Sequence, residues 1–286
     1  MEKAFEIRNL KFSYHASKKV TLDNISFSVD KGMIFGLLGP SGAGKSTTQK
    51  ILTKLLTGYS GEVLYFGKEV KTLGRDFYEK IGVGFESPVH FNNLTANQNL
   101  AYFSSLYKTK IDYLSLLTRV GLKDAADQQV GEYSKGMKVR LNFVRALLND
   151  PEFIFLDEPT NGLDPSNAYI IKEIIKELRD QGKTIIISTH LMGDVEQLCD
   201  KVAFINHGHI SEMATPQDLK LKYGKKEITI EFLNDEAIKK ITFPMEGLAD
   251  NKQFLEIIKT NTILTIHSGE TTMEDIFMKV TGELNE

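Results

Sequence analysis

The clearest chemical signal in the chain is residues 39–47, which read GPSGAGKST. Glycine has no Cβ, so the three glycines let the backbone bend closely around an anion. Successive backbone N–H groups at the start of a helix then form a positive cradle for phosphate. In such a loop Lys45 would reach the β- and γ-phosphates of a nucleotide, and the Ser46 hydroxyl would be a ligand of Mg²⁺. The spacing predicts a nucleoside-triphosphate site rather than a glycine-rich turn with a chance lysine.

Two carboxylates at the end of another apolar segment fit the same chemistry. Residues 153–158 read FIFLDE, a pattern typical of a buried strand that ends in two acids. At such a position Asp157 would hold Mg²⁺, and Glu158 would take the proton of an attacking water. A strand followed by a solvated turn is the alternative, and the intact phosphate loop makes it the weaker one.

A histidine follows a third apolar strand. Residues 184–190 read TIIISTH, and a helix over 167–181 is expected between this strand and the acid pair. A strand–helix–strand unit directs both strands the same way. We therefore expect His190 and the two acids at the same edge of a sheet, where open α/β sheets bind ligands.

The phosphate loop needs a strand before it and a helix after it. Residues 33–38 read MIFGLL, a short apolar run that predicts a buried strand. Over residues 47–56, Ile51, Leu52, Leu55 and Leu56 recur at helical spacing, which predicts a helix. These elements indicate an α/β fold.

Composition narrows the class of protein. The 286 residues suffice for one large domain with a small appendage, and 41% are hydrophobic. The net charge of −3, from 35 basic and 38 acidic residues, favours no nucleic-acid partner. We expect neither a membrane-spanning helix nor a signal peptide, and hence a cytoplasmic protein or one held at a membrane through something else. The single cysteine, Cys199, excludes an internal disulfide and is expected to be buried.

Together these pieces resemble the ATP-binding-cassette (ABC) ATPases, over roughly residues 3–220. Tyr14 is similar to the aromatic residue that stacks on adenine in that family, although an aromatic that packs at a strand end is the alternative. Residues 133–137, YSKGM, resemble the family's signature loop, with Ser134 as a helix N-cap. Residues 161–164, NGLD, resemble its aspartate-bearing loop, and His190 resembles its switch histidine.

The resemblance assigns roles to individual residues. It implies that ATP is bound by Tyr14, Gly39, Pro40, Ser41, Gly42, Ala43, Gly44, Lys45, Ser46 and Thr47. It implies Glu158, His190 and Glu86 as catalytic residues and Ser46, Asp157 and Glu86 as the residues around Mg²⁺. It implies that two cassettes associate and that a signature loop of Ser134, Lys135, Gly136 and Met137 acts in trans, completing the nucleotide site of the other cassette. It places Asp164 in a loop that couples the two cassettes.

Two departures from the family pattern stand out. Lys135 replaces the usual first glycine of the signature, and Met137 replaces the usual glutamine. Ser134 and Gly136, which carry the γ-phosphate contact, are kept. Glu86 stands where most relatives have glutamine, and an exposed loop acid is the alternative reading. These departures resemble bacitracin-type, lantibiotic-immunity and multidrug ABC ATPases.

The resemblance implies an α/β P-loop NTPase with an ABC-type cassette, a mixed sheet flanked by helices with a helical insert. We expect the cassette over 1–222, the insert over about 87–150 and a small α+β accessory domain over 223–286. In the accessory domain, alternation over 227–232 and 262–267 predicts strands, and 272–275 fit a helix capping box. The aromatic residues of the insert could pack internally or dock a partner.

The resemblance also implies a mechanism and partners. Two cassettes, identical or homologous, would sandwich two ATP molecules and would move a separate integral-membrane permease from the cytoplasmic face of the membrane. The expected function is export of an antibiotic, peptide or lipid-like compound. The alternative is a soluble ABC ATPase that acts on ribosomes, nucleic acid or iron–sulfur assembly, and the single short cassette favours the transporter.

Overall fold

The computed structural model describes residues 2–14, 20–87, 89–109, 111–234, 237–269 and 271–282. The chain divides into two compact units, Met1–Thr215 and Pro216–Glu286. Helix α7 (Pro216–Tyr223) belongs to the second unit, where it packs against α9 (Met273–Thr281). No helix among the described residues is both long enough and apolar enough to cross a membrane.

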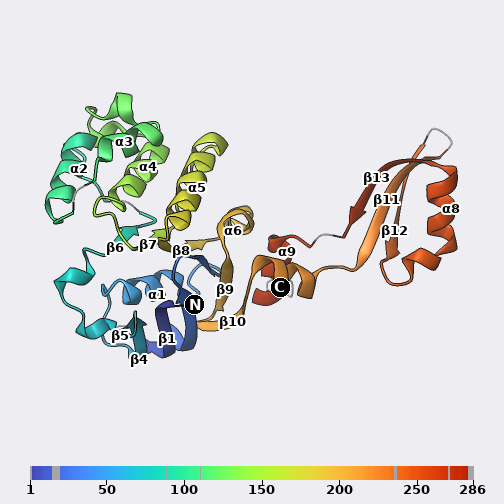
Figure 1. The fold of residues 1–286 in the computed structure, drawn as a ribbon, viewed down its shortest axis with the longest axis horizontal. Coiled ribbons are helices and arrows are strands. Elements are labelled where there is room, and N and C mark those ends of the chain that lie inside the picture. The colour runs from blue at the N-terminus through green and yellow to red at the C-terminus, as the bar shows by residue number, and fades with distance from the viewer. Residues whose placement is uncertain are drawn as a thin grey trace. The chain divides into compact units, whose positions relative to one another are not determined.

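A six-stranded sheet forms the centre of the first unit (Figure 1). Its strand order is β10-β9-β3-β8-β7-β6, and all neighbours are parallel except β10 and β9. The strands are β3 (Ile34–Leu38), β6 (Ile81–Gly84), β7 (Phe153–Asp157), β8 (Thr184–Thr189), β9 (Lys201–Asn206) and β10 (His209–Ala214). Every residue of β3 and β8 is buried, as the apolar runs predict.

The parallel direction of these strands brings the predicted site together. The carboxyl ends of parallel neighbours lie at one edge of a sheet. The phosphate loop follows β3, and Glu86 lies two residues after β6. Asp157 ends β7, with Glu158 next, and His190 directly follows β8. Four segments far apart in the sequence therefore meet at that edge.

A second, antiparallel sheet covers one face of the first. It has the order β2-β1-β4-β5, from β1 (Lys3–Phe12), β2 (Leu22–Asp30), β4 (Ser60–Tyr65) and β5 (Lys68–Glu69). Phe5 of β1 packs edge-on against Phe153 and Phe155 of β7, with ring centroids 4.7 and 5.8 Å apart. Helices α5 (Pro165–Asp180) and α6 (Met192–Leu198) contact β8. Cys199 is buried as predicted, and burial raises the pKa of its thiol.

The helix after the phosphate loop, α1, spans Lys45–Leu52, so the predicted extent to residue 56 is wrong. Lys54 adopts a left-handed conformation with φ of 60°. The amides of Leu55 and Lys54 donate to the carbonyls of Lys50 and Ile51, at 2.8 and 3.0 Å. This bond pair is a Schellman motif, which ends a helix whatever the spacing of apolar residues beyond it.

The helical insert contains α2 (Ala96–Ser105), α3 (Tyr113–Arg119) and α4 (Lys135–Arg145). Thr95 and Gln98 form a capping box at the start of α2. Ser134 caps α4 by accepting a hydrogen bond from the Met137 amide at 3.2 Å, which confirms the predicted N-cap. Helix α4 thereby begins inside the signature loop.

The second unit contains a three-stranded antiparallel sheet of order β12-β11-β13. The strands are β11 (Glu227–Asn234), β12 (Ala237–Pro244) and β13 (Thr262–Ser268), with helix α8 (Lys252–Thr260) between β12 and β13 in the chain. Ile230, Phe232, Phe243 and Ile257 form its small core. The capping box of Thr272 and Asp275 is confirmed at α9. The sequence analysis missed β12, because its lysines obscure the alternation.

Candidate active site

The phosphate loop has the backbone that its glycines predict. Gly39, Gly42 and Gly44 adopt φ values of 155°, 78° and 115°, which side chains rarely allow. A Cβ on Gly39 would lie 2.1 Å from the Ile205 carbonyl oxygen, and one on Gly44 would lie 2.5 Å from the side chain of Leu22. Both positions therefore require glycine for conformation and for space.

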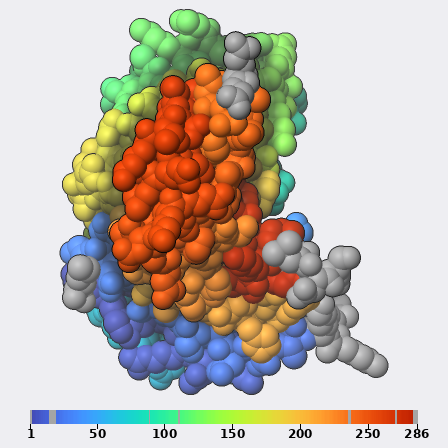
Figure 2. All heavy atoms as spheres, turned by 90° about the vertical axis from the view of Figure 1, so that its right-hand side faces the viewer, coloured from blue at the N-terminus to red at the C-terminus, as the bar shows by residue number. Residues whose placement is uncertain are grey.

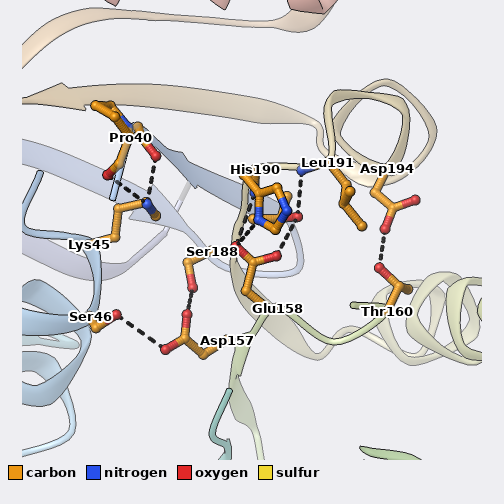
Figure 3. Close-up of polar contacts among 12 residues, drawn as sticks. Pro40, Lys45, Ser46, Asp157, Glu158, Thr160, Ser188, His190, Leu191 and Asp194 are labelled. Carbon is orange, nitrogen blue, oxygen red and sulfur yellow. Dashed lines mark hydrogen bonds and ion pairs between the residues drawn. The ribbon is translucent and has the colours of Figure 1, made fainter. Parts of the chain in front are cut away.

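Lys45 lies inside the loop that it is predicted to serve (Figure 3). Its ammonium donates hydrogen bonds to the carbonyl oxygens of Gly39 at 2.6 Å and Pro40 at 3.1 Å. Burial lowers the pKa of Lys45, and the carboxylates of Glu158, Asp157 and Glu86 oppose that shift. The three acids thus share an electrostatic environment with the lysine, as expected from the common sheet edge.

Asp157 is fixed from two sides. Its carboxylate accepts hydrogen bonds from the hydroxyl of Ser46 at 3.3 Å and from the hydroxyl of Ser188 (Figure 3). Ser188 in turn accepts from the buried amide of Gln49 at 3.0 Å. Ser46 and Asp157 therefore place two hard oxygen atoms side by side, the ligand type that Mg²⁺ prefers.

Glu158 is a buried carboxylate in a strained backbone. Its residue is 8% exposed, and its φ of 51° is unusual for a residue with a side chain. The carboxylate accepts hydrogen bonds from the Thr189 hydroxyl at 3.1 Å and from the His190 amide at 3.1 Å. The His190 ring Nδ1 lies 2.7 Å from the same carboxylate (Figure 3). The structure thus joins the predicted catalytic acid directly to the predicted switch histidine.

A second buried contact joins the same two loops, and the sequence analysis missed it. Thr160, two residues after Glu158, donates its hydroxyl to the carboxylate of Asp194 in α6 (Figure 3). The ammonium of Lys172 in α5 lies 3.2 Å from the same carboxylate, and both charged side chains are nearly buried. Asp194 therefore ties the loop after β7 to the helix after His190. A lone aspartate in a helix gave no signal of this in the sequence.

We expect Asp194→Ala to lower kcat for ATP hydrolysis about tenfold or more, because small misplacements of catalytic groups are costly. Its KM for ATP should change little, since Asp194 lies behind the loops rather than among the phosphate-loop residues. Steady-state kinetics measures both values. Lys172→Met is the matched control, because it removes the ion pair and leaves the Thr160 contact. An unchanged kcat in folded Asp194→Ala protein would contradict this positioning role.

Tyr14 lies beside the phosphate loop. Its hydroxyl is 3.2 Å from the Thr47 hydroxyl, and its ring meets Phe12 edge-on at 5.0 Å. The residue is 39% exposed, so one part of the ring packs and another part faces solvent. This arrangement leaves a ring surface open for a base to stack on.

Glu86 lines a groove of about 770 Å³ between the central sheet and the helical insert. Ser46 and Asp157 line the same groove on the nucleotide side. On the insert side, Asn142 of α4 donates to the Phe85 carbonyl at 2.8 Å and so fixes the backbone next to Glu86. The groove therefore reaches from the nucleotide site to the insert, with Glu86 between them.

The aromatic residues of the insert pack against one another, and two of them also line the groove. Phe91 packs against Tyr102 and Phe103, with ring centroids 5.2 and 5.7 Å apart. Phe103 and Tyr107 also line the groove, where the Arg145 guanidinium lies 4.9 Å from the Phe103 ring. Burial lowers the pKa of Arg145. The lining of the groove is thus partly aromatic, and the Arg145 guanidinium adds a partly buried positive charge to it.

The signature loop contacts the aspartate-bearing loop of its own chain. The aliphatic part of Lys135 lies against Gly162, where an added Cβ would be 3.1 Å from the lysine Cε. Asp164 caps α5 by accepting from the Asn167 amide at 3.1 Å, and the hydrogen bonds with Asn167 lower the pKa of Asp164. Among the residues that the structure describes, no hydrogen bond or ion pair joins 134–137 to 39–47.

A phosphate loop after a buried parallel strand, with a neighbouring strand that ends in an acid pair, defines a P-loop nucleoside triphosphatase. Residues 22–161 match the family model described as ABC transporter. Residues 226–270 match a second model, described as Fluoroquinolone efflux ABC transporter C-terminal domain. The chain belongs to the ABC transporter family, as an ATP-binding subunit that hydrolyses ATP.

Several curated proteins are similar to this chain. A Fluoroquinolones export ATP-binding protein of Mycobacterium tuberculosis is 45% identical over 278 residues, covering 96% of this chain and 92% of the relative. The Lantibiotic transport ATP-binding protein SrtF of Streptococcus pyogenes is 40% identical over 206 residues, covering 72% and 88%. The Linearmycin resistance ATP-binding protein LnrL of Bacillus subtilis is 32% identical over 280 residues, covering 96% and 84%.

Solved structures agree on the fold. A structure titled as the ATP binding subunit of an ABC transporter has a TM-score of 0.70 and 27% identity, covering 77% of this chain and 93% of that chain. A dimeric ATP-binding cassette has a TM-score of 0.68 at 24% identity, covering 74% and 98%. The α/β cassette fold expected from the sequence is therefore confirmed.

Proposed function

We propose that this chain powers a separate membrane permease that exports an antibiotic, peptide or lipid-like compound. The observation that carries the proposal is that the similarity to an exporter subunit extends beyond the cassette into the C-terminal residues. The 45% identity to a fluoroquinolone exporter subunit covers 96% of this chain, and residues 226–270 match a C-terminal domain model of that class. Cassettes look much alike across transporters, so the C-terminal match supports export more specifically.

We assign the nucleotide contacts to the edge of the central sheet. Tyr14 stacks on adenine, and the amides of 39–47 with the Lys45 ammonium surround the phosphates. In the structure, the Lys45 ammonium donates hydrogen bonds to two loop carbonyls, which hold it at the phosphate cradle. The same segment contains Pro40, Ser41 and Ala43, which lie between its glycines, and Thr47, which lies in the first turn of α1.

We assign Mg²⁺ to Ser46 and Asp157, with Glu86 nearby. The oxygen atoms of Ser46 and Asp157 are 3.3 Å apart, and a hydroxyl with a carboxylate suits a hard cation. When bound, the ion would offset the charge of the phosphates. Glu86 adds a second carboxylate to the groove, in addition to that of Asp157, and we place it in the site directly or through water.

We assign the general-base role to Glu158. Its carboxylate is held by Thr189 and by the amide and ring of His190, so its orientation is set before a water molecule arrives. Burial beside a ring nitrogen keeps the acceptor oxygen in one place. His190 is 56% exposed at its side chain, so the ring can reach both Glu158 and a phosphate.

We propose that two cassettes complete each site in trans. Ser134, Lys135, Gly136 and Met137 begin α4, and the positive end of that helix would face the γ-phosphate bound to the other copy. Asp164 and Gly162 lie next to this loop and would couple the two sites. The partner is a second copy of this chain or a homologous cassette.

We propose that the groove beside Glu86 receives a short cytoplasmic helix of the permease. Its lining includes Phe85, Val89, Phe103 and Tyr107, an apolar surface suited to a helix. A segment seated there would contact the backbone next to Glu86, so the nucleotide state could reach the permease. The chain would thus lie at the cytoplasmic face of the membrane, with the unit Met1–Thr215 as the motor and the unit Pro216–Glu286 as an accessory domain, so that the whole of α7 belongs to the accessory domain.

Co-purification tests the function. We expect tagged Glu158→Gln protein with ATP, extracted in detergent from membranes, to recover a membrane protein with several spans at equal stoichiometry. Lys45→Ala is the control and should recover less of it, because recovery is predicted to depend on bound nucleotide. Ribosomal or iron–sulfur assembly proteins in place of a membrane protein would contradict the proposal.

A further inference from the structure

Hydrogen bonds around the Asp157 carboxylate close into a ring. Its Oδ2 accepts from the Ser46 hydroxyl at 3.3 Å, and its Oδ1 accepts from the Ser188 hydroxyl (Figure 3). The side-chain amide of Gln49 donates to the Ser188 hydroxyl at 3.0 Å. Ser46 and Gln49 lie three positions apart on α1, and so on one face of that helix. Helix α1 therefore reaches both oxygens of Asp157, one directly and one through Ser188.

The two side chains that support Asp157 from behind are buried. Ser188 is 0% exposed and Gln49 is 7% exposed. All four residues of the ring belong to the first unit, and none belongs to the second, whose surface is orange to red in Figure 2. The ring therefore depends on contacts within the cassette.

Packing alone does not explain Gln49. Burying an amide costs free energy unless it is hydrogen-bonded, and an apolar side chain of similar volume would fill the same space without that cost. The buried neighbours Ile51 and Leu52 on α1 are apolar. The bond to Ser188 therefore accounts for an amide at this position.

The chemistry of the groups fixes the direction of each hydrogen bond. A carboxylate only accepts, so the single proton of the Ser188 hydroxyl goes to Asp157. Ser188 can then only accept from Gln49, which must turn its NH₂ group toward that hydroxyl. One arrangement of protons thus satisfies the three groups, and Gln49 orients Asp157 through two hydrogen bonds in series.

We propose that Gln49 is a positioning residue that raises the affinity of the nucleotide site for Mg²⁺, acting on Asp157 through Ser188. The inference rests on the assignment of Mg²⁺ to Ser46 and Asp157 in the proposed function, and it goes beyond that assignment. Because Ser188 holds Oδ1, Oδ2 is the oxygen that lies next to Ser46 and is available to a cation. Removing the partner that orients a metal ligand typically costs about 10- to 100-fold in metal affinity.

A Mn²⁺ titration tests the proposal in the full chain. Glu158→Gln protein keeps ATP intact, and Mn²⁺ suits the same oxygen ligands as Mg²⁺. The ion is added to this protein with equimolar ATP, and the EPR signal of free Mn²⁺ measures binding. Gln49→Met removes the amide at nearly constant length, and we expect it to weaken Mn²⁺ binding about tenfold. Unchanged Mn²⁺ affinity would overturn the proposal.

ATP affinity in EDTA separates positioning from general damage to the site. Gln49→Met should bind ATP without a metal ion as tightly as the parent protein does, and an equal loss of both affinities would overturn the positioning role. Thr53→Val is the matched control. Thr53 is also buried, and its hydroxyl bonds to the carbonyls of Gln49 and Lys50 on the same helix. This control should leave both affinities unchanged, and a Mn²⁺ loss as large as that of Gln49→Met would contradict the proposal.

Ser188→Ala provides an independent variant, and it keeps the test decisive if Gln49→Met does not fold. It should weaken Mn²⁺ binding at least as much as Gln49→Met, because it removes the hydroxyl that contacts Asp157. The double variant should bind Mn²⁺ like Ser188→Ala alone, since both substitutions interrupt the same series of bonds. Losses that add in the double variant would show that Gln49 does not act through Ser188.

Asp157→Asn distinguishes failure of this inference from failure of the proposed function. It should weaken Mn²⁺ binding more than either substitution behind it. If it leaves Mn²⁺ affinity unchanged, the Mg²⁺ assignment is wrong and the inference falls with it. If it weakens Mn²⁺ binding while Gln49→Met and Ser188→Ala do not, the assignment stands and the role of Gln49 is wrong.

Discussion

Glu158→Gln should lower the maximal rate of ATP hydrolysis by about 10²-fold or more, while ATP binding is retained. The amide keeps the shape of the side chain and can still bond to Thr189 and His190. It cannot take a proton from water, so the chemical step fails after the nucleotide has bound. We expect the variant to accumulate as a closed dimer with intact ATP. Phosphate release and sedimentation with ATP and Mg²⁺ measure the two effects.

Glu86→Gln is the matched control for this substitution. Both changes replace a carboxylate with its amide at the same sheet edge, but Glu86 is exposed and lines the groove, whereas Glu158 is buried against His190. We expect Glu86→Gln to retain most of the turnover. Normal turnover in Glu158→Gln would remove Glu158 from the role of general base.

Mixing two inactive subunits should restore ATP hydrolysis if the sites are completed in trans. Lys45→Ala removes the cation at the phosphates, and Gly136→Asp brings a negative side chain to the signature loop. Each variant alone should lose about 10²-fold or more in rate, because electrostatic stabilisation of the transferred phosphoryl group is a large part of catalysis. In a mixed dimer, one of the two sites combines an intact Lys45 with an intact Gly136, so each mixed dimer should have about half of the wild-type activity. With free exchange in a 1:1 mixture, about half of the dimers are mixed, so the mixture should return to about a quarter of the wild-type value.

The mixing experiment distinguishes sites that are completed in trans from sites that are built within one chain. If each site were built within one chain, no combination of these two variants would contain a complete site, and the mixture would stay inactive. A mixture of Lys45→Ala with Lys45→Ala,Gly136→Asp protein is the control, since it offers no intact phosphate loop in either geometry. Recovery in that control would point to a contaminating ATPase.

The sequence determined the chemistry of the site because its motifs are local. The conformation of 39–47 follows from three glycines, and the structure has the positive φ values that they allow. Buried strands were visible as short apolar runs, and parallel pairing then brought Asp157 and His190 to one edge. The family and the cassette fold followed from such segments in order.

Local patterns also set limits on prediction. The apolar spacing beyond Leu52 suggested a longer helix, but backbone hydrogen bonds around Lys54 end it. Strand β12 was invisible to the sequence analysis, because its side chains are mostly exposed and its identity depends on pairing with β11. In both cases a contact that apolar periodicity does not report decided the outcome.

By itself, then, the sequence determined the phosphate loop, the acid pair, the histidine and the class of fold, since each depends on residues close together in the chain. Only the tertiary structure decided how they cooperate. The bond from His190 to Glu158 and the clamp of Thr160 on Asp194 join residues more than thirty positions apart. Burial of apolar side chains sets which loops meet. Hydrogen-bond geometry then selects which polar side chains of those loops pair with each other. Neither can be read from the spacing of residues along the chain.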